Sequence, residues 1–421
     1  MFFKNNISEY TKNVLTLVTG TSIAQFIPIA ISPILTRIYS PEDFGVLTLF
    51  MSISLIFGSI SSARYEMAIM LPEKDEDALS ISFLAVFISF FFSLIIFIAL
   101  FFFKDLIFIK LNNSKLGLLI YLCPLLVFLI GLYNVLINYN NRKKKYKDIA
   151  KANIYKSITM SSVQLVFPVI KSGSIGLIIG YFLSHISSNL QLIKNFFVDR
   201  EMFKKINKNK VLKLGSKYIK FPKYSMPATL ANIMSTQFVN ILISSFFGLS
   251  TLGFYSLVQK VLGMPISIIG SSISQVYYQE SVRMNLKEGN SYIVIKKTVL
   301  KLILIGIPIF SILFFIIEDL FEFVYGVEWR IAGEYSKILI FLFFLRFISS
   351  TVSLTLSVYQ KQEFELIINL LLLIFGVSLI YLFKDDFKEY LIYYSILIGG
   401  LYAVFLLYYF ELSKGQKNKY L

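Results

Sequence analysis

The sequence has few of the residues on which soluble folds, disulfides and metal sites depend. Its 421 residues include one cysteine, one histidine and one tryptophan, and only 16% are charged. The single Cys123 excludes an internal disulfide, and the single His185 excludes a histidine-based metal cluster, so we expect no metal site and no cofactor. A soluble protein needs roughly 25% charged residues to cover its surface, which excludes an ordinary cytosolic enzyme.

Long apolar runs take the place of these residues. Hydrophobic residues make up 56% of the chain, phenylalanine alone occurs 42 times, and the mean hydropathy is +0.70. A membrane-spanning helix needs about 20 mostly apolar residues, and the backbone of a barrel strand would show alternation that is absent here. We therefore expect an all-α polytopic membrane protein with twelve transmembrane helices. They cover residues 13–37, 44–70, 79–103, 115–138, 153–170, 175–197, 222–247, 252–278, 296–317, 335–359, 364–383 and 389–411.

Lysine and arginine set the expected orientation. With the N-terminus inside, 26 of the 41 Lys and Arg residues fall in cytoplasmic segments and nine in outer ones. The positive-inside rule then predicts that both termini are cytoplasmic. The same bias explains the net charge of +16 without a nucleic-acid partner, so the basic runs NRKKKYK and KKINKNK are interpreted as topology signals next to the lipid bilayer.

A weak internal repeat divides the chain into halves. The segment SPEDFGVLTLF (40–50) resembles GLSTLGFYSL (248–257), and aligning Gly45 with Gly253 gives an offset of 208 residues. We expect an N-terminal six-helix bundle at 1–197, a cytoplasmic linker at 198–221 and a C-terminal six-helix bundle at 222–421. Paired bundles around a central cavity that opens alternately to each side are typical of transporters.

Polar residues mark the spans that would line this cavity. They recur every three or four residues on the seventh and eighth spans, which places them on one helix face. A long polar stripe is unfavourable against lipid, so it faces water or protein, and interhelical hydrogen bonding is the alternative for any single residue. The residues singled out as substrate-binding are Gln25 on the first span, Asn232, Thr236 and Asn240 on the seventh, and Lys260 and Gln275 on the eighth.

Ionisable residues inside spans are functional candidates by default. Lys260 lies about 12 Å from the outer edge of its span, at 1.5 Å per residue, and Arg346 lies near mid-membrane. His185 is either a proton-coupling residue or an interior histidine that is hydrogen-bonded to its polar neighbours. Of these two roles, we expect His185 to be the hydrogen-bonded interior histidine.

Arg64 and Glu66 are two further ionisable residues, two positions apart in the second predicted span. On one regular helix two residues this far apart point to nearly opposite sides. Glu66 shares a polar face with several serines of the second span, so we expect Glu66 to point inward and only one of the two to line the path squarely, unless the helix is distorted. Glu66 is a candidate substrate-binding residue and also a possible site of ion coupling.

Several segments resemble a known family. They are RIYSPEDFG (37–45), SSARYEMAIMLPEKDEDA (61–78), PKYSMPATLANIMSTQ (222–237), GFYSLVQKVLGMPISIIGSSISQVYYQE (253–280) and YGVEWRIAGEYSKIL (325–339). They are similar to bacterial polysaccharide flippases of the multidrug, oligosaccharidyl-lipid and polysaccharide exporter superfamily. The resemblance implies a MATE-like fold of two six-helix bundles with a cationic lumen, and it gives Arg64 added weight as a substrate-binding residue.

The resemblance also implies a function. The expected substrate is an undecaprenyl-diphosphate-linked O-antigen or capsule repeat unit, moved from the cytoplasmic to the outer leaflet of the bacterial inner membrane beside a polymerase and chain-length machinery. Lys260, Arg346 and Arg64 would pair with the diphosphate, and no G-x-x-x-x-G-K-[ST] loop supplies a nucleotide motor. We expect a non-enzymatic transporter.

Two alternatives stay open. A drug or organic-cation antiporter would use the same scaffold, although cationic cavity residues would repel its substrate. A membrane polysaccharide polymerase would need catalytic groups on a sizeable outer loop, whereas the largest outer segments, 104–114 and 318–334, are short.

Overall fold

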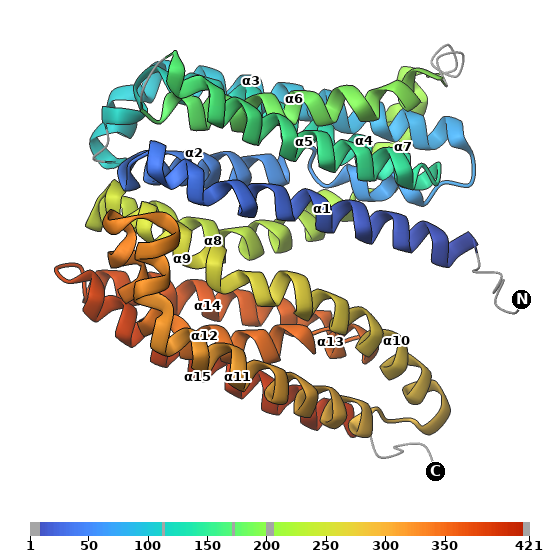
Figure 1. Cartoon of the computed structure of the whole chain (residues 1–421). Helices are drawn as coiled ribbons and strands as arrows, with labels where there is room; N and C mark the ends of the chain where they lie inside the picture. The colour runs from blue at the N-terminus through green and yellow to red at the C-terminus, as the bar shows by residue number, and fades with distance from the viewer. Residues whose placement is uncertain (1–8, 112–113, 171–172, 199–205, 416–421) are drawn as a thin grey trace, which may run out of the picture. The chain divides into compact units, whose positions relative to one another are not determined.

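The structure is a computed structural model that describes residues 9–111, 114–170, 173–198 and 206–415, and no strand occurs among them (Figure 1). The chain divides into two compact units, Met1–Ile233 and Met234–Leu421. The expected all-α fold is therefore confirmed. The division at a 198–221 linker stays a prediction, and residues 199–205 of that segment lie outside the described residues.

The first unit is built from helices that Figure 1 colours from blue to green. Within it α5 packs against α1 and α6, while α4 packs against α2, α3 and α6. The helices are α1 (Glu9–Ile38), α2 (Pro41–Ile60), α3 (Asp75–Leu111), α4 (Leu122–Arg142), α5 (Tyr146–Val166), α6 (Ile175–Val198) and α7 (Lys208–Lys217), and α8 (Met226–Phe247) begins in this unit.

The second unit is arranged around one central helix, α12 (Arg330–Thr351), which packs against α9, α11 and α15. The remaining helices are α9 (Leu249–Pro265), α10 (Ser271–Glu288), α11 (Tyr292–Tyr325), α13 (Thr355–Val358), α14 (Gln362–Leu382) and α15 (Phe387–Ser413). Gly333 allows α12 to approach α11 closely, because a Cβ there would lie 2.6 Å from the Glu318 Cα. Side chains on α12 are thus placed in the middle of the unit.

Hydropathy divides the helices into two groups. Ten helical segments of the described residues are long and apolar enough to cross a membrane. The expected fifth and sixth spans fall on α5 and α6, which are helices but carry too many polar residues to be among these ten. A multi-pass membrane protein is therefore confirmed, while twelve crossings and cytoplasmic termini stay predictions.

The repeated motif found in the sequence marks helix starts. Ser40 caps α2 with a reciprocal pair of hydrogen bonds: its Oγ accepts from the Asp43 backbone N–H at 3.3 Å, and the Asp43 carboxylate accepts from the Ser40 N–H at 3.1 Å. In the second copy Gly248, at φ 88°, precedes α9. Both copies of the motif therefore end one helix and begin the next.

Among the described residues, two π-turns lie within a predicted span or at the start of one. They cover Phe221–Ser225 (η5) and Ile266–Gly270 (η6), and each includes or follows a proline, which cannot donate to the helical ladder. The turn at η6 shifts the helix face between Lys260 on α9 and Gln275 on α10. That Lys260 and Gln275 belong to a single polar stripe on the eighth span stays a prediction.

Candidate functional site

A polar cavity lies inside the second unit. It has a volume of about 270 Å³ and is bounded by α8, α9, α12, α14 and α15. Its lining residues are mostly hydroxyl, amide and aromatic side chains around one arginine; they are Ser235, Thr236, Gln237, Val239, Asn240, Tyr255, Gln259, Leu342, Arg346, Leu372, Tyr394, Ile398 and Tyr402. Of the predicted site residues, Arg346, Thr236 and Asn240 meet here.

Helical spacing explains why these residues converge. Side chains four positions apart lie on one helix face, and the lining residues come in such sets on four helices. Thr236 and Asn240 form one set, Tyr255 and Gln259 a second, Leu342 and Arg346 a third, and Tyr394, Ile398 and Tyr402 a fourth. The cavity is therefore the meeting point of four helix faces rather than of loops.

Among the residues that the structure describes, Arg346 is the only charged one that lines this cavity. Among the described residues no carboxylate pairs with it; its guanidinium carbon lies 5.7 Å from the centre of the Phe343 ring, and Tyr255, Tyr394 and Tyr402 are close enough to interact with its charge. A guanidinium offers five N–H donors in a fixed fork that matches phosphate and carboxylate groups. Chemically, the cavity suits an anion that carries hydroxyl groups.

Six polar lining residues were missed by the sequence analysis: Ser235, Gln237, Tyr255, Gln259, Tyr394 and Tyr402. Gln259 Nε2 donates to the Tyr255 hydroxyl at 2.5 Å, which orders the α9 side of the cavity. On α8, Gln237 donates to the Thr236 Oγ1 at 3.3 Å and Asn240 donates to the Gln237 Oε1 at 3.4 Å. The sequence did contain one indication of Tyr394 and Tyr402: they lie eight residues apart in an apolar span, which places both on one helix face.

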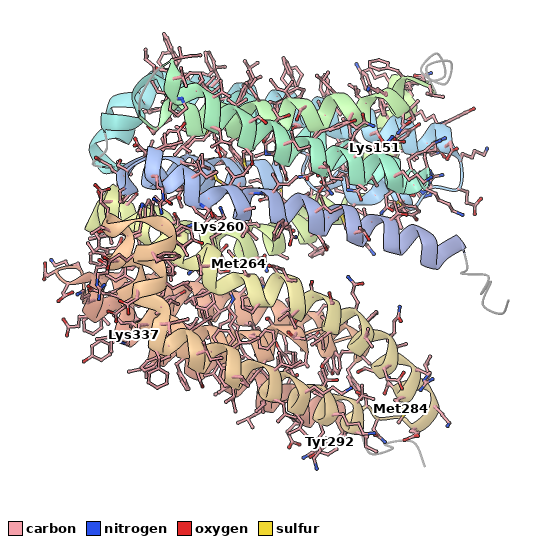
Figure 2. The ribbon with its side chains drawn as sticks, in the orientation of Figure 1. Lys151, Lys260, Met264, Met284, Tyr292 and Lys337 are labelled. Carbon is pink, nitrogen blue, oxygen red and sulfur yellow. The ribbon has the colours of Figure 1, made fainter. Side chains whose placement is uncertain are left out.

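The other predicted residues lie elsewhere. Lys260 is partly buried on α9, one turn before Met264 (Figure 2), and follows directly after the cavity residue Gln259, but it does not line the cavity itself. Gln25 on α1, Asn232 on α8 and Gln275 on α10 are exposed in this structure. Their roles in binding stay predictions.

Arg64 and Glu66 sit at a break in the second predicted span. The expected continuous helix over 44–70 is wrong, because α2 ends at Ile60 and a 3₁₀ helix, η1 (Tyr65–Met70), follows. Ala63 and Arg64 adopt left-handed backbone conformations with φ of 50° and 62°, which non-glycine residues rarely do. This distortion brings the Arg64 Nη1 to 3.0 Å from the Glu66 Oε1, so the two side chains meet instead of diverging.

The second carboxylate oxygen of Glu66, Oε2, also has a hydrogen-bond partner. Its side chain is 1% exposed, and Ser62 Oγ donates to Oε2 at 2.5 Å, while the Arg64 side chain keeps 21% exposure. That Glu66 points toward the transport path stays a prediction. Arg64 is therefore the member of the pair that can still meet solvent or a ligand.

Arg142 fixes the connection that follows the break. Its guanidinium donates to the carbonyl oxygens of Ile69 (3.2 Å), Met70 (3.4 Å), Pro72 (2.7 Å) and Glu73 (3.3 Å), and it pairs with Asp75 at 2.9 Å. The sequence analysis counted Arg142 only as a topology signal. In the structure it holds the segment between η1 and α3.

His185 lies in the core of the first unit, at 2% exposure. Its ring packs edge-on against Tyr133 and Tyr181, with centroid distances of 6.1 and 5.1 Å, and Lys156 from α5 lies over the Tyr133 ring at 4.9 Å. Neither ring nitrogen has a hydrogen-bond partner among the described residues. The hydrogen-bonded histidine that we expected is therefore wrong, because its serine neighbours donate to backbone carbonyls instead.

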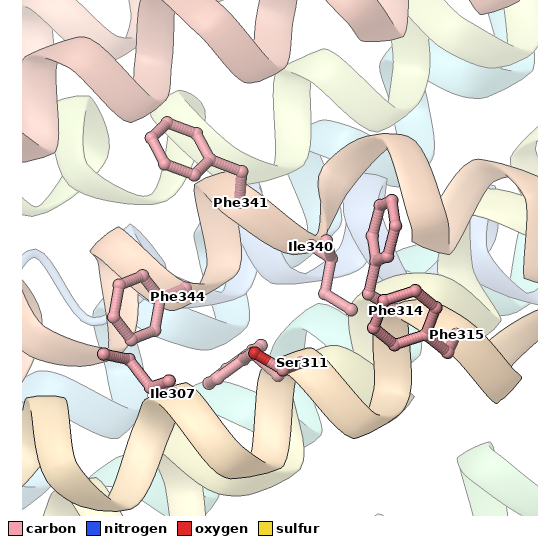
Figure 3. A pocket seen from close by; sticks show the side chains of 8 residues that line it. Ile307, Ser311, Phe314, Phe315, Ile340, Phe341 and Phe344 are labelled. Atoms are coloured by element: carbon pink, nitrogen blue, oxygen red, sulfur yellow. The ribbon is translucent and has the colours of Figure 1, made fainter.

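A second cavity in the same unit as Arg346 is apolar. It has a volume of about 380 Å³ between α11 and α12, and Figure 3 shows phenylalanine and isoleucine side chains around a single hydroxyl, that of Ser311. Phe315 and Phe341 are 80% and 59% exposed. Such a surface suits hydrocarbon and not a charged headgroup, so the cavity around Arg346 is the better candidate for polar chemistry.

Together, the helical spans define a multi-pass membrane protein whose second unit holds a polar cavity. Residues 34–334 match the polysaccharide biosynthesis protein family, and the chain belongs to that family. No curated protein sequence matches the chain.

Solved structures show the same fold at low sequence identity. The lipid II flippase MurJ, in an inward closed conformation, is 17% identical over 95% of this chain and 89% of its own, with a TM-score of 0.72. A MOP superfamily transporter from Pyrococcus furiosus is 14% identical over 96% of both chains, with a TM-score of 0.60. A point mutant of the Vibrio cholerae MATE transporter VcmN is 12% identical over 95% of both chains, with a TM-score of 0.58. The expected MATE-like fold is thus confirmed.

Proposed function

We propose that this protein is a flippase that moves undecaprenyl-diphosphate-linked oligosaccharides, such as O-antigen or capsule repeat units, from the cytoplasmic to the outer leaflet of a bacterial inner membrane. The single observation that carries the proposal is the cavity whose only charged lining residue is Arg346 and whose other polar groups are hydroxyls and amides. An arginine fork recognises phosphate, and hydroxyls and amides recognise sugar. Family membership supports the same assignment.

The acidic residues needed for an alternative substrate are missing from this cavity. No Asp or Glu is among the described residues that line the cavity, so the cation of a drug antiporter would meet no opposite charge there, and only Tyr255, Tyr394 and Tyr402 could attract it. Arg346 would repel such a substrate. A diphosphate with attached sugars meets the opposite charge and abundant hydrogen-bonding groups.

We propose alternating access without chemistry on the substrate, so the protein acts as a transporter and not as an enzyme. The diphosphate bears about two negative charges, and their outward movement across an inside-negative potential of ~100 mV releases about 4–5 kcal/mol. Lys260 and Arg64 would add cationic contacts along the path, with Asn232, Gln275 and Gln25 as hydrogen-bonding groups. The polyprenyl tail would stay in lipid throughout.

Ion coupling, if it operates, would use one of two buried groups. Glu66 is already neutralised by Arg64 and by the Ser62 hydroxyl. His185 has unpartnered ring nitrogens, and Lys156 from α5, Tyr133 from α4 and Tyr181 from α6 are the charged and titratable groups around it. We therefore propose His185 as the coupling residue. In vesicles, a pH gradient should then stimulate transport by the wild type and not by His185→Gln; no stimulation of the wild type would refute this part.

Reconstitution tests the main proposal. The purified chain is placed in vesicles with an undecaprenyl-diphosphate oligosaccharide that carries a nitrobenzoxadiazole tag on its sugar. We expect the inner-leaflet pool to become accessible to external dithionite only in vesicles that hold the protein. Accumulation of a cationic dye against its gradient, with the tagged lipid still protected, would establish the antiporter instead.

A further inference from the structure

Helix α7, which the sequence analysis assigned to a linker, packs against other helices of the first unit. Leu214 belongs to the same buried apolar cluster as Tyr65 and Leu79, and the Tyr65 hydroxyl donates to the Gly215 carbonyl at 2.9 Å. Lys210 Nζ lies 2.6 Å from the Asp77 Oδ1 at the start of α3. The hydrogen bond that Lys210 donates to Asp77 raises the pKa of Lys210, so this ion pair stays ionised throughout the neutral range.

An apolar groove runs between α7 and α3. It has a volume of about 570 Å³ and is lined by Phe83, Leu84 and Phe87 from α3 and by Ile206, Lys208, Val211 and Leu212 at α7. Phe83, Phe87 and Leu212 remain 51%, 54% and 59% exposed. Phe83 follows Asp75 by eight residues, which is about 12 Å along α3, so the groove lies close to the end of this membrane span. Hydrocarbon is the natural neighbour of such a surface at that depth.

Charge around the groove is of one sign. Of the described residues that line it, Lys208 is the only charged one, and Lys213 and Lys217 are exposed on the same helix. Among the described residues none of these three lysines has a carboxylate partner, in contrast to Lys210. Lys213 lies five residues after Lys208, about 140° further round the helix, and so points away from the groove side. The groove thus combines an apolar floor with one cation at its edge.

We propose that this groove binds an anionic phospholipid, with an acyl chain against Phe83, Phe87 and Leu212 and the phosphate at Lys208. A basic amphipathic helix beside a membrane span favours anionic headgroups of the cytoplasmic leaflet, where the positive-inside rule places this lysine-rich segment. The transported lipid is a poorer occupant. Its sugars need hydroxyl or amide partners, and the groove lining supplies none. The proposal is independent of what the protein transports.

Brominated lipids test the site in the full-length chain. Leu212→Trp, at an exposed position, places a fluorophore in the groove, and the unmodified chain reports the background, because its one tryptophan, Trp329, is 1% exposed. Vesicles contain brominated phosphatidylglycerol or brominated phosphatidylcholine at equal mole fraction. We expect brominated phosphatidylglycerol to occupy the groove about fivefold more strongly, as one lysine near the membrane surface would give.

Two lysine variants in the Leu212→Trp background distinguish lipid binding at Lys208 from a general attraction of anionic lipid to the positive charge of α7. Lys208→Gln should abolish the preference for phosphatidylglycerol, while the matched control Lys213→Gln, on the other side of α7, should keep most of it. Equal quenching by both lipids, or equal loss in both variants, would overturn the proposal, as would quenching that only a brominated polyprenyl diphosphate produces. Phe87→Trp is the second reporter if Leu212→Trp does not fold.

Discussion

Replacing Arg346 with methionine distinguishes a role in substrate binding from a role in folding, because the structure predicts a large loss of transport and little change in stability. No carboxylate pairs with this guanidinium among the described residues, so its removal leaves no buried opposite charge behind. The packing lost against Phe343, at 5.7 Å, is worth about 0.5–1 kcal/mol. We therefore expect the free energy of unfolding and the amount of protein in the membrane to change little.

Transport should fall much further. A charge-assisted hydrogen bond to phosphate contributes about 1.5–3 kcal/mol, which corresponds to a loss of about 10- to 100-fold in apparent affinity for the lipid diphosphate. Arg346→Lys keeps the charge but loses the two-pronged geometry, so an intermediate rate is expected. The assay is the initial rate of tagged-lipid exposure to dithionite, measured over a range of lipid concentrations.

A matched arginine provides the control. Arg283 on α10 is 72% exposed and, within the described part of the chain, pairs with Glu280, three residues before it, so Arg283→Met removes the same charge away from the cavity. Its transport should match the wild type. Wild-type rates in Arg346→Met, or equal losses in both variants, would refute the assignment of Arg346 to substrate binding.

Three further outcomes follow from the structure. Arg142→Ala should lower the free energy of unfolding by about 2–4 kcal/mol, measured by thermal unfolding. Arg142→Lys should be little better, because an ammonium cannot reach four carbonyls at once. Lys147→Ala, at an exposed site, is the control and should leave the free energy of unfolding unchanged. Gly333→Ala should destabilise by about 1–3 kcal/mol through contact with α11 backbone, while Gly400→Ala, with open space around its Cβ position, should be neutral or stabilising. Glu328→Cys should react with a membrane-impermeant maleimide in intact cells, whereas the buried native cysteine should not; labelling only after permeabilisation would reverse our topology.

Part of the candidate site could be predicted from the sequence. Arg346 is a charge in an apolar span, and Thr236 and Asn240 repeat at helical spacing, so hydropathy and periodicity were enough to select them. Tyr255, Gln259 and Tyr394 were missed because tyrosine and glutamine near span centres have ordinary structural uses. Only the packing of α9 and α15 around α12 shows that they share one cavity with Arg346.

The break at Arg64 illustrates the opposite case. Ala63 and Arg64 are not residues that favour a left-handed backbone, so local propensity predicts a continuing helix there. Contacts from elsewhere in the chain fix the segment after this turn: Arg142 donates to the carbonyl of Ile69, within η1, and to that of Pro72, which follows η1. A local pattern cannot report a conformation that distant residues impose.

The sequence by itself determined the helices, the membrane environment and the charges within spans, because burial of apolar side chains in lipid depends on composition and periodicity along one segment. The tertiary structure decided which polar faces meet, where the second span breaks, and that α7 packs on α3. These features depend on contacts between residues far apart in the chain, which no single segment encodes.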